Sequence, residues 1–154
     1  MSNKPKFFIL DVDGVLTSGQ FYYSEEGKLL KKFGPHDSDG LKMIKKFISI
    51  KFISADKRGF EISKKRIVDD MGYELSLVNE ESRFNYIKSN YGFDNTIFMG
   101  DSIHDAHILK KCFFGISPNN ARVEAKQSSD FVTPSNASEG AVMDACIEVL
   151  KFFE

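Results

Sequence analysis

The chain has 154 residues, of which 42% are hydrophobic and 15 are phenylalanine, so it is long enough for one domain, residues 1–154, with a packed core. Its 21 basic and 22 acidic residues leave a formal net charge of -1. This balance gives no electrostatic reason to expect nucleic acid or a membrane surface as the partner, so a small molecule is the expected one.

Strand and helix patterns alternate along the chain. Apolar runs with β propensity occur at residues 6–10, 50–54, 75–78, 96–99, 113–116 and 130–132. Helical periodicity lies between or after them, at 39–48, 59–71, 80–91, 102–112, 121–126 and 139–153. The alternation predicts an α/β fold, a Rossmann-like three-layer sandwich with a central parallel sheet and helices on both faces.

The first apolar run delivers two carboxylates into a glycine turn, because Phe7-Phe8-Ile9-Leu10 is followed by Asp11-Val12-Asp13-Gly14. Ligands of parallel sheets bind beyond the carboxyl ends of the strands, so Asp11 and Asp13 are expected to project into that crevice. Side chains two residues apart lie on the same side of a strand, with the carbonyl of Val12 between them. Such crowded oxygens repel one another unless a cation joins them, and hard oxygen ligands of this kind suit Mg2+.

A β-hairpin interrupts the alternation at about residues 19–33, with its turn at Glu25-Glu26-Gly27. Because it follows the aspartate turn immediately, the hairpin is expected to stand over or beside the site. The aromatic run Phe21-Tyr22-Tyr23 indicates either packing within the hairpin or a partner surface.

Two polar residues follow later in the chain. Ser54 ends the run 50–54, where its hydroxyl can either bind a phosphate oxygen or serve an ordinary turn. Arg83 lies early in the predicted helix 80–91, where the helix dipole disfavours a cation. Its position therefore indicates either an anionic partner or pairing with Glu80.

A second acidic pair follows the strand 96–99, where Gly100 lets the chain turn closely. Asp101 and Asp105 are four residues apart and share one face of the next helix. If this strand lies beside the first one, the pair faces Asp11 across the crevice. An aspartate at a helix start is often an N-cap, but several carboxylates gathered without a cation are unstable, so the combined motifs favour a metal site.

The ordered motifs resemble the haloacid dehalogenase superfamily of aspartate-nucleophile phosphatases. They are Asp-Val-Asp-Gly-Val-Leu-Thr at 11–17, the strand-terminal Ser54, the helical Arg83 and Gly-Asp-x-x-x-Asp at 100–105. The hairpin, the segment Lys32-Phe33-Gly34-Pro35-His36-Asp37-Ser38-Asp39-Gly40 and the tail Glu139-Gly140-Ala141-Val142 are similar to one branch. That branch comprises the 3-deoxy-D-manno-octulosonate 8-phosphate phosphatases and related nonulosonate 9-phosphate phosphatases, and it implies a fold without a cap domain.

The resemblance implies a Mg2+-dependent phosphatase that hydrolyses the phosphate monoester of a small sugar or sugar acid through an aspartyl-phosphate intermediate. Asp11 is then the nucleophile, and Asp13 is the general acid and base. Ser54 and Arg83 are expected to bind the phosphoryl oxygens. The implied metal set is Asp11, the carbonyl of Val12, Asp13, Asp101 and Asp105, the last supporting either the metal or Arg83. The resemblance also implies a homotetramer built through the hairpin.

Four residues, in three motifs, depart from that branch. Its members usually carry Gly-Arg after the motif Ser or Thr, where this chain has Ala55-Asp56, and an arginine where His36 stands. The arginine of their tail is replaced here by Met143. The substrate therefore stays open between an octulosonate 8-phosphate, a nonulosonate 9-phosphate and a different phosphorylated sugar of a surface-glycan pathway.

Another class of function is also open, namely a phospho-acceptor or non-catalytic signalling module. Receiver domains are α/β proteins that bind Mg2+ and phosphorylate an aspartate, but their acceptor lies on a later strand. The position of Asp11 on the first strand favours the phosphatase. No apolar run approaches the roughly 20 residues of a membrane span, and the first four residues lead into a strand without a signal segment, so we expect a cytoplasmic protein.

Overall fold

The structure is a computed structural model that describes residues 3–154. Its strands are β1 (Phe7–Asp11), β2 (Thr17–Ser24), β3 (Gly27–Phe33), β4 (Ser49–Ser54), β5 (Glu74–Leu77), β6 (Thr96–Met99), β7 (Phe114–Ser117) and β8 (Phe131–Val132). Its α-helices are α1 (His36–Ile44), α2 (Phe60–Lys64), α3 (Arg83–Asn90), α4 (Ala106–Lys111), α5 (Val123–Ser128) and α6 (Ala141–Leu150). Within these residues, no helix combines the length and apolarity needed to cross a membrane.

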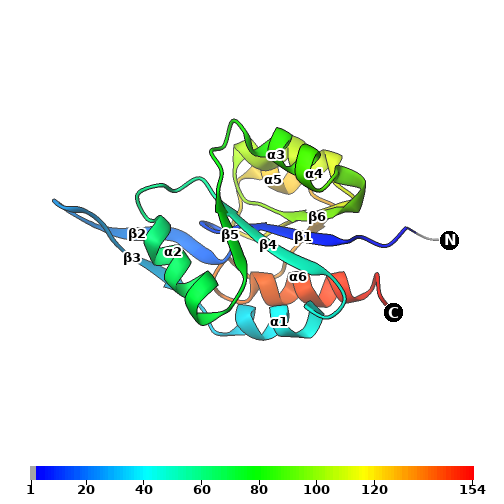
Figure 1. Ribbon diagram of the computed structural model, residues 1–154, viewed down its shortest axis with the longest axis horizontal. Helices are drawn as coiled ribbons and strands as arrows, with labels where there is room; N and C mark the ends of the chain where they lie inside the picture. Colours follow the sequence, from blue (N-terminus) through cyan, green and yellow to red (C-terminus); the bar gives the residue numbers. More distant parts are fainter. Residues whose placement is uncertain (1–2) are drawn as a thin grey trace.

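Six strands form one parallel sheet in the order β5-β4-β1-β6-β7-β8. Helices α3, α4 and α5 cover one face, and α1 and α6 cover the other (Figure 1). This arrangement confirms the predicted α/β sandwich with a central parallel sheet. The strand order places β1 between β4 and β6, so the carboxyl ends of all three strands meet at one edge.

Both faces of β1 are buried, which explains why its sequence is continuously apolar. Phe8 and Leu10 belong to a core cluster that includes residues of α1 and α6. Ile9 belongs to a second cluster, with residues of α3, α4 and α5. Because side chains alternate along a strand, the central strand anchors a helical layer on each side and holds Asp11 rigidly at its end.

The hairpin of β2 and β3 forms a separate two-stranded antiparallel sheet that projects from the body (Figure 1). It begins two residues earlier than predicted, because Thr17 already pairs with Phe33. Gly27 follows the turn with φ at +119°, a conformation that favours glycine. Apolar side chains of the hairpin are exposed: Phe21, Tyr22, Tyr23, Leu29 and Leu30.

The predicted helices occur at the expected places with different ends. The pattern over 59–71 is divided into α2 and a π-helical segment, Lys65–Asp70. The pattern over 102–112 begins as the 3-10 turn Ile103–Asp105, whose start is fixed by a capping box between Ser102 and Asp105, and α4 follows it. The pattern over 80–91 becomes helical only at Arg83. Hydrogen bonds at each end, which periodicity does not report, decide these boundaries.

Asp37 is a buried carboxyl group at the start of α1. Its Oδ1 accepts a hydrogen bond of 3.2 Å from the N–H of Met143, in the first turn of α6. Its Oδ2 has no partner among the described residues. Burial raises the pKa of Asp37 to about 6, and the N–H groups of Met143 and Val142 oppose this rise only in part.

We expect the Asp37→Asn variant to be more stable than the wild type at neutral pH. The ordinary pKa of 3.8 applies in the unfolded chain, so folding disfavours the ionised form by about 3 kcal/mol above pH 6. This cost shrinks as the pH falls from 6 to 4, because the wild-type carboxyl becomes protonated in the folded state. Urea unfolding at pH 7.5 and pH 4 tests this. If the free energy of unfolding differs between the wild type and Asp37→Asn by the same amount at both pH values, the expectation is contradicted.

Candidate active site

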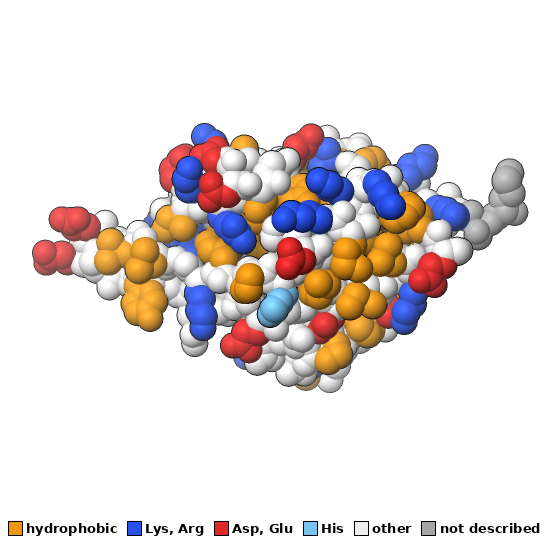
Figure 2. Space-filling view, turned by 90° about the horizontal axis from the view of Figure 1, so that it is seen from below, with side chains coloured by type: hydrophobic (Ala, Val, Ile, Leu, Met, Phe, Trp, Pro, Cys, Tyr) orange, Lys and Arg blue, Asp and Glu red, His pale blue; other side chains and the backbone are white. Residues whose placement is uncertain are grey.

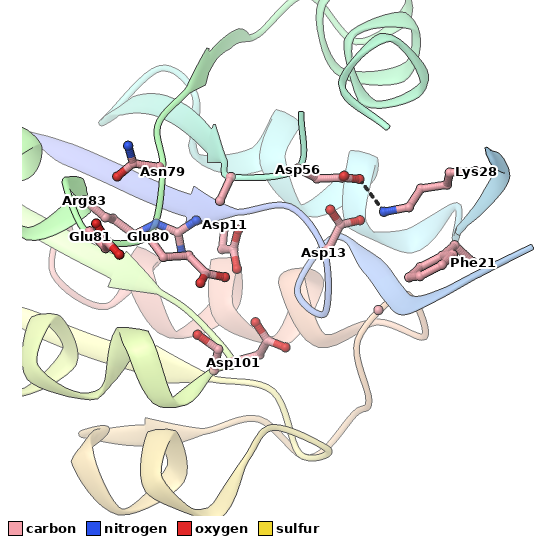
Figure 3. Close-up of a pocket in the computed structure, with 13 residues that line it drawn as sticks. Asp11, Asp13, Phe21, Lys28, Asp56, Asn79, Glu80, Glu81, Arg83 and Asp101 are labelled. Carbon is pink, nitrogen blue, oxygen red and sulfur yellow. Dashed lines mark hydrogen bonds and ion pairs between the residues drawn. The ribbon is translucent and has the colours of Figure 1, made fainter. Parts of the chain in front are cut away.

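The carboxyl ends of β1, β4 and β6 border a cavity of about 680 Å³ (Figure 3). Asp11 is the last residue of β1, and Asp101 follows β6 by two residues. The hairpin contributes to the wall as well. The lining residues are Asp11, Asp13, Gly19, Phe21, Lys28, Ala55, Asp56, Asn79, Glu80, Glu81, Arg83, Asp101 and Ser102.

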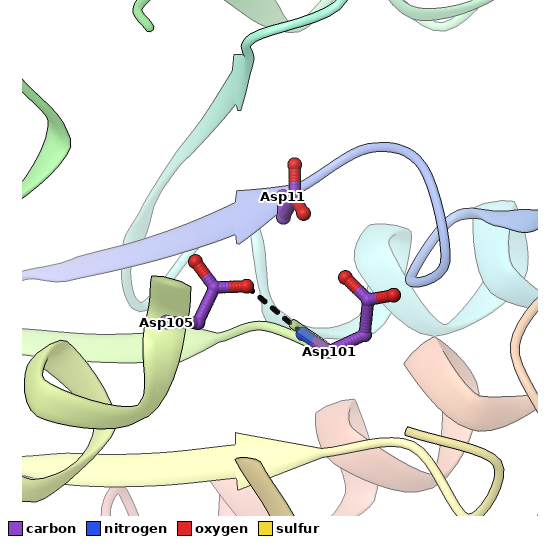
Figure 4. Close-up of side chains that lie close together, drawn as sticks. All are labelled: Asp11, Asp101 and Asp105. Atoms are coloured by element: carbon purple, nitrogen blue, oxygen red, sulfur yellow. Dashed lines mark hydrogen bonds between the residues drawn. The ribbon is translucent and has the colours of Figure 1, made fainter. Parts of the chain in front are cut away.

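Three carboxylates meet on one side of this cavity. Asp11, Asp101 and Asp105 each offer an oxygen, and these oxygens lie within 4.8 Å of one another (Figure 4). Burial raises the pKa of Asp11 to about 6, against the opposing charge of Arg83. Burial and the carboxylates of Asp11 and Asp105 raise the pKa of Asp101 to about 9. The raised pKa values show that burial and mutual repulsion disfavour the negative charge of these carboxylates. A divalent cation would offset that repulsion and prefers hard oxygen ligands, so the cluster fits a metal ion.

Arg83 holds this cluster from the first turn of α3. Its Nη1 donates to Oδ1 of Asp105 at 2.7 Å, and its Nη2 lies 3.4 Å from Oδ1 of Asp11. The side chain is only 3% exposed. Burial alone would lower the pKa of Arg83, but the carboxylates of Asp11 and Asp105 raise it, so the guanidinium stays charged.

The alternative pairing of Arg83 with Glu80 does not occur. Glu80 instead lies 3.0 Å from Nε2 of His104. Asp105, which is buried, uses its remaining oxygen, Oδ2, to accept the N–H groups of Asp101 and Ser102 and the hydroxyl of Ser102. Asp105 is therefore a structural support that orients Arg83 and the Asp101 loop.

Two glycines allow the loops after β1 and β6 to approach each other. Gly14 has φ at +82°, and a Cβ atom on it would overlap the carboxylate of Asp101. A Cβ atom on Gly100 would lie 2.6 Å from Oδ2 of Asp105. The acidic cluster therefore requires a bare backbone at both positions.

The turn after β1 separates Val12 and Asp13 from the acidic cluster. The carbonyl of Val12 accepts N–H groups of Val15, Leu16 and Thr17, at 2.9 to 3.2 Å. This carbonyl is thus directed into the loop, and its place in the metal set stays a prediction. The Asp13 side chain lies toward the hairpin, where its Oδ2 is 3.0 Å from Nζ of Lys31, and the cluster of three carboxylates does not include it. The chain leaves the strand immediately after Asp11, so strand alternation does not describe where these two groups lie.

Ser54 is buried at the end of β4, where its hydroxyl accepts the N–H of Asp56 at 3.1 Å. Its role in binding phosphate stays a prediction. Of the positions that depart from the resembled branch, Ala55 and Asp56 line the cavity. His36 and Met143 are not among the lining residues, so the departures on the cavity wall are those at Ala55 and Asp56.

Sequence reasoning missed the lysines that the hairpin brings to the site. Lys28 lies 2.7 Å from Oδ2 of Asp56, and Lys31 lies 2.8 Å from the same oxygen. Burial would raise the pKa of Asp56, but both ammonium groups outweigh it and lower the pKa to about 2. The exposed pattern of the hairpin contains no signal for these contacts, because they depend on where the hairpin lies relative to the loop after β4.

Comparison with known proteins agrees with this geometry. A sequence profile described as haloacid dehalogenase-like hydrolase matches residues 82–145. The chain is 29% identical over 151 residues to the 3-deoxy-D-manno-octulosonate 8-phosphate phosphatase of Haemophilus influenzae. The aligned region covers 95% of this chain and 83% of that protein. It is 25% identical over 151 residues to the protein of the same name from Salmonella typhi, with 92% and 77% covered.

Solved structures of such phosphatases share the fold. The cobalt-bound form from Haemophilus influenzae matches with a TM-score of 0.80 at 27% identity, over 97% of this chain and 89% of that one. The phosphatase of Moraxella catarrhalis, solved with a magnesium ion, a phosphate ion and a 3-deoxy-D-manno-octulosonate (KDO) molecule, matches with a TM-score of 0.79 at 25% identity, over 96% and 87%. The likeness therefore extends over nearly the whole chain.

Proposed function

We propose, from the premise that this chain is a haloacid dehalogenase-like phosphatase, that it uses Mg2+ to hydrolyse the phosphate monoester of a small sugar or sugar acid. The observation that carries the proposal is the position of Asp11, which ends the central strand, contacts Arg83 and lies beside Asp101. This arrangement combines a nucleophile, a cation for phosphoryl oxygens and a metal-binding carboxylate in one cavity. The whole chain, residues 1–154, would act as one catalytic domain.

The reaction would proceed in two steps. A carboxylate oxygen of Asp11 attacks phosphorus, an oxygen–phosphorus bond forms, and the bond from phosphorus to the sugar oxygen breaks. Asp13 gives its proton to the departing sugar oxygen. In the second step Asp13 takes a proton from water, which attacks the aspartyl phosphate, releases inorganic phosphate and restores Asp11.

The remaining residues stabilise the charge that moves during these steps. Arg83 would bind phosphoryl oxygens, since its guanidinium lines the cavity and stays charged. Ser54 would donate its hydroxyl to the same group. Asp11 and Asp101 would hold Mg2+, with Asp105 as support behind them. When bound, the ion neutralises negative charge so that an anionic phosphate can approach a carboxylate.

The substrate class rests on the relatives, which are named as phosphatases of 3-deoxy-D-manno-octulosonate 8-phosphate. We propose an octulosonate 8-phosphate or nonulosonate 9-phosphate as the first candidates, and another phosphorylated sugar of a surface-glycan pathway as the next. Asp56 supports keeping the latter, because it places a carboxylate on the cavity wall. The proposed location of the reaction is the cytoplasm.

A panel of phosphorylated sugars and sugar acids tests the proposed function. We expect the purified protein to release inorganic phosphate from at least one sugar or sugar-acid phosphate of the panel in the presence of Mg2+. Release should stop in the presence of a chelator and return when excess Mg2+ is added. Full activity in the chelator, or no release from any member of the panel, would overturn the proposal.

We also propose that the chain forms a homotetramer through its hairpin. Figure 2 shows apolar side chains gathered on the hairpin behind an acidic tip. A patch of this kind on a projecting element is typical of a protein–protein interface. Light scattering should give the mass of four chains for the intact protein and a smaller mass after deletion of residues 20–32.

A further inference from the structure

We propose that Lys31, on the hairpin, is a positioning residue that holds the carboxyl group of Asp13 in the orientation needed for proton transfer. The inference rests on the proposed function, in which Asp13 is the general acid and base. It assigns a second role to the hairpin besides assembly, namely to complete the site of its own chain.

Lys31 is unusual because its side chain is only 1% exposed. Burying an ammonium group is costly unless its charge and its donors are satisfied. Nζ lies 3.0 Å from Oδ2 of Asp13, 2.8 Å from Oδ2 of Asp56 and 2.8 Å from Oγ of Ser63. The contacts with Asp13 and Ser63 are hydrogen bonds and the contact with Asp56 is an ion pair, so all three restrict the direction of the group.

These acceptors come from three separate parts of the fold. Asp13 lies in the loop after β1, Asp56 in the loop after β4, and Ser63 on α2. The ion pair with Asp56 and the hydrogen bond to Ser63 hold the ammonium group in place, where it donates to Asp13. A long, flexible side chain acts here as a rigid brace between the hairpin and the catalytic loop.

The carboxyl group of Asp13 is held on both of its oxygens. Oδ2 contacts Lys31, and Oδ1 accepts the hydroxyl of Thr17 at 3.2 Å. Figure 3 shows Asp13 on the side of Asp56 and Lys28, away from Arg83. In the proposed reaction Arg83 binds the phosphoryl group, so the leaving sugar oxygen would point toward Asp13. A general acid must lie within hydrogen-bond reach of that oxygen, and fixing its rotamer secures this reach.

The test uses two substrates that differ in their need for an acid. p-Nitrophenyl phosphate releases a stable phenolate anion without protonation, whereas 3-deoxy-D-manno-octulosonate 8-phosphate must release an alcohol. We expect the Lys31→Met variant to lose on the order of 100-fold in kcat/KM with the sugar phosphate, and less than about threefold with the nitrophenyl ester. kcat/KM reports the first chemical step, in which only the sugar oxygen needs the proton.

Two lysine variants serve as matched controls. Lys28→Met removes the other partner of Asp56 but leaves Asp13 and Lys31 in contact, and Lys32→Met changes an exposed neighbour on the same strand. For each control variant, any change in kcat/KM should be the same with the sugar phosphate and with the nitrophenyl ester. Lys31→Arg keeps a cationic donor and should restore part of the activity on the sugar phosphate. If Lys31→Met does not fold, Lys31→Gln should show the same dependence.

Equal losses on both substrates, or unchanged kcat/KM on both, would overturn the role of Lys31 while leaving the phosphatase intact. If the wild type does not accept the octulosonate ester, the most active sugar phosphate of the panel replaces it. A wild type that hydrolyses none of these esters with Mg2+ would overturn the proposed function itself. The two failures are therefore distinguishable.

Discussion

The Asp11→Asn variant should lose phosphate release by about 10⁴-fold or more, because an amide cannot form the aspartyl phosphate. The substitution preserves the shape of the side chain. The fold should survive, since burial already disfavours the charge of Asp11 and raises its pKa to about 6. Colorimetric phosphate release with excess Mg2+, together with a thermal melt, measures both effects.

The control for this variant is Asp94→Asn, an exposed aspartate in the turn that precedes β6. It lies at the amino end of the sheet and is not among the residues that line the cavity. It should retain wild-type activity. Comparable activity in Asp11→Asn and the wild type would refute the nucleophilic role of Asp11.

The Arg83→Met variant should be destabilised by about 3–5 kcal/mol in its free energy of unfolding. Arg83 is the buried cation of the cluster, paired with Asp105 at 2.7 Å and with Asp11 at 3.4 Å. Methionine fills much of the aliphatic volume but leaves the carboxylate of Asp105 buried and unpaired. Urea denaturation at neutral pH without metal measures the loss, and a change below about 1 kcal/mol would contradict it.

A double variant separates the lost ion pair from lost packing. Adding Asp105→Asn to Arg83→Met removes the unpaired charge, so part of the stability should return, whereas activity should not. Arg122→Met is the control, because Arg122 pairs with Glu124 at the surface and is 69% exposed. Its effect on stability should stay within about 1 kcal/mol. Activity of the Arg83 variant should fall by roughly 10² to 10³, since it removes a cation aimed at the developing charge.

Much of the fold could be predicted because its signals are local. The apolar run that ends at Leu10 and the alternation of strand and helix patterns are properties of short segments, and the observed sheet has the expected strands. The prediction that Asp101 and Asp105 face Asp11 needed one further condition, that β6 lies beside β1. The structure confirms this condition through the pairing of Leu10 with Met99.

What the sequence did not specify lies in the loops and in contacts distant in sequence. Alternation along a strand placed Val12 and Asp13 with Asp11, but the turn that begins after the strand directs the Val12 carbonyl inward and Asp13 toward the hairpin. The partners of Arg83 are Asp105 and Asp11, 22 and 72 residues away, and not Glu80 just before the helix. Periodicity describes neither a turn nor a pairing between elements.

The sequence by itself therefore determined the sheet, the strand end that carries Asp11 and the carboxylates that gather there, because strand and helix periods dictate which faces are buried. Only the tertiary structure decided which groups complete the site. The base of the hairpin lies beside the site, so Lys31 reaches Asp13, 18 residues earlier, and Asp56, 25 residues later, while α2 supplies Ser63. A buried ammonium group selects its partners by charge and distance, and those distances exist only once the sheet, hairpin and helix have packed.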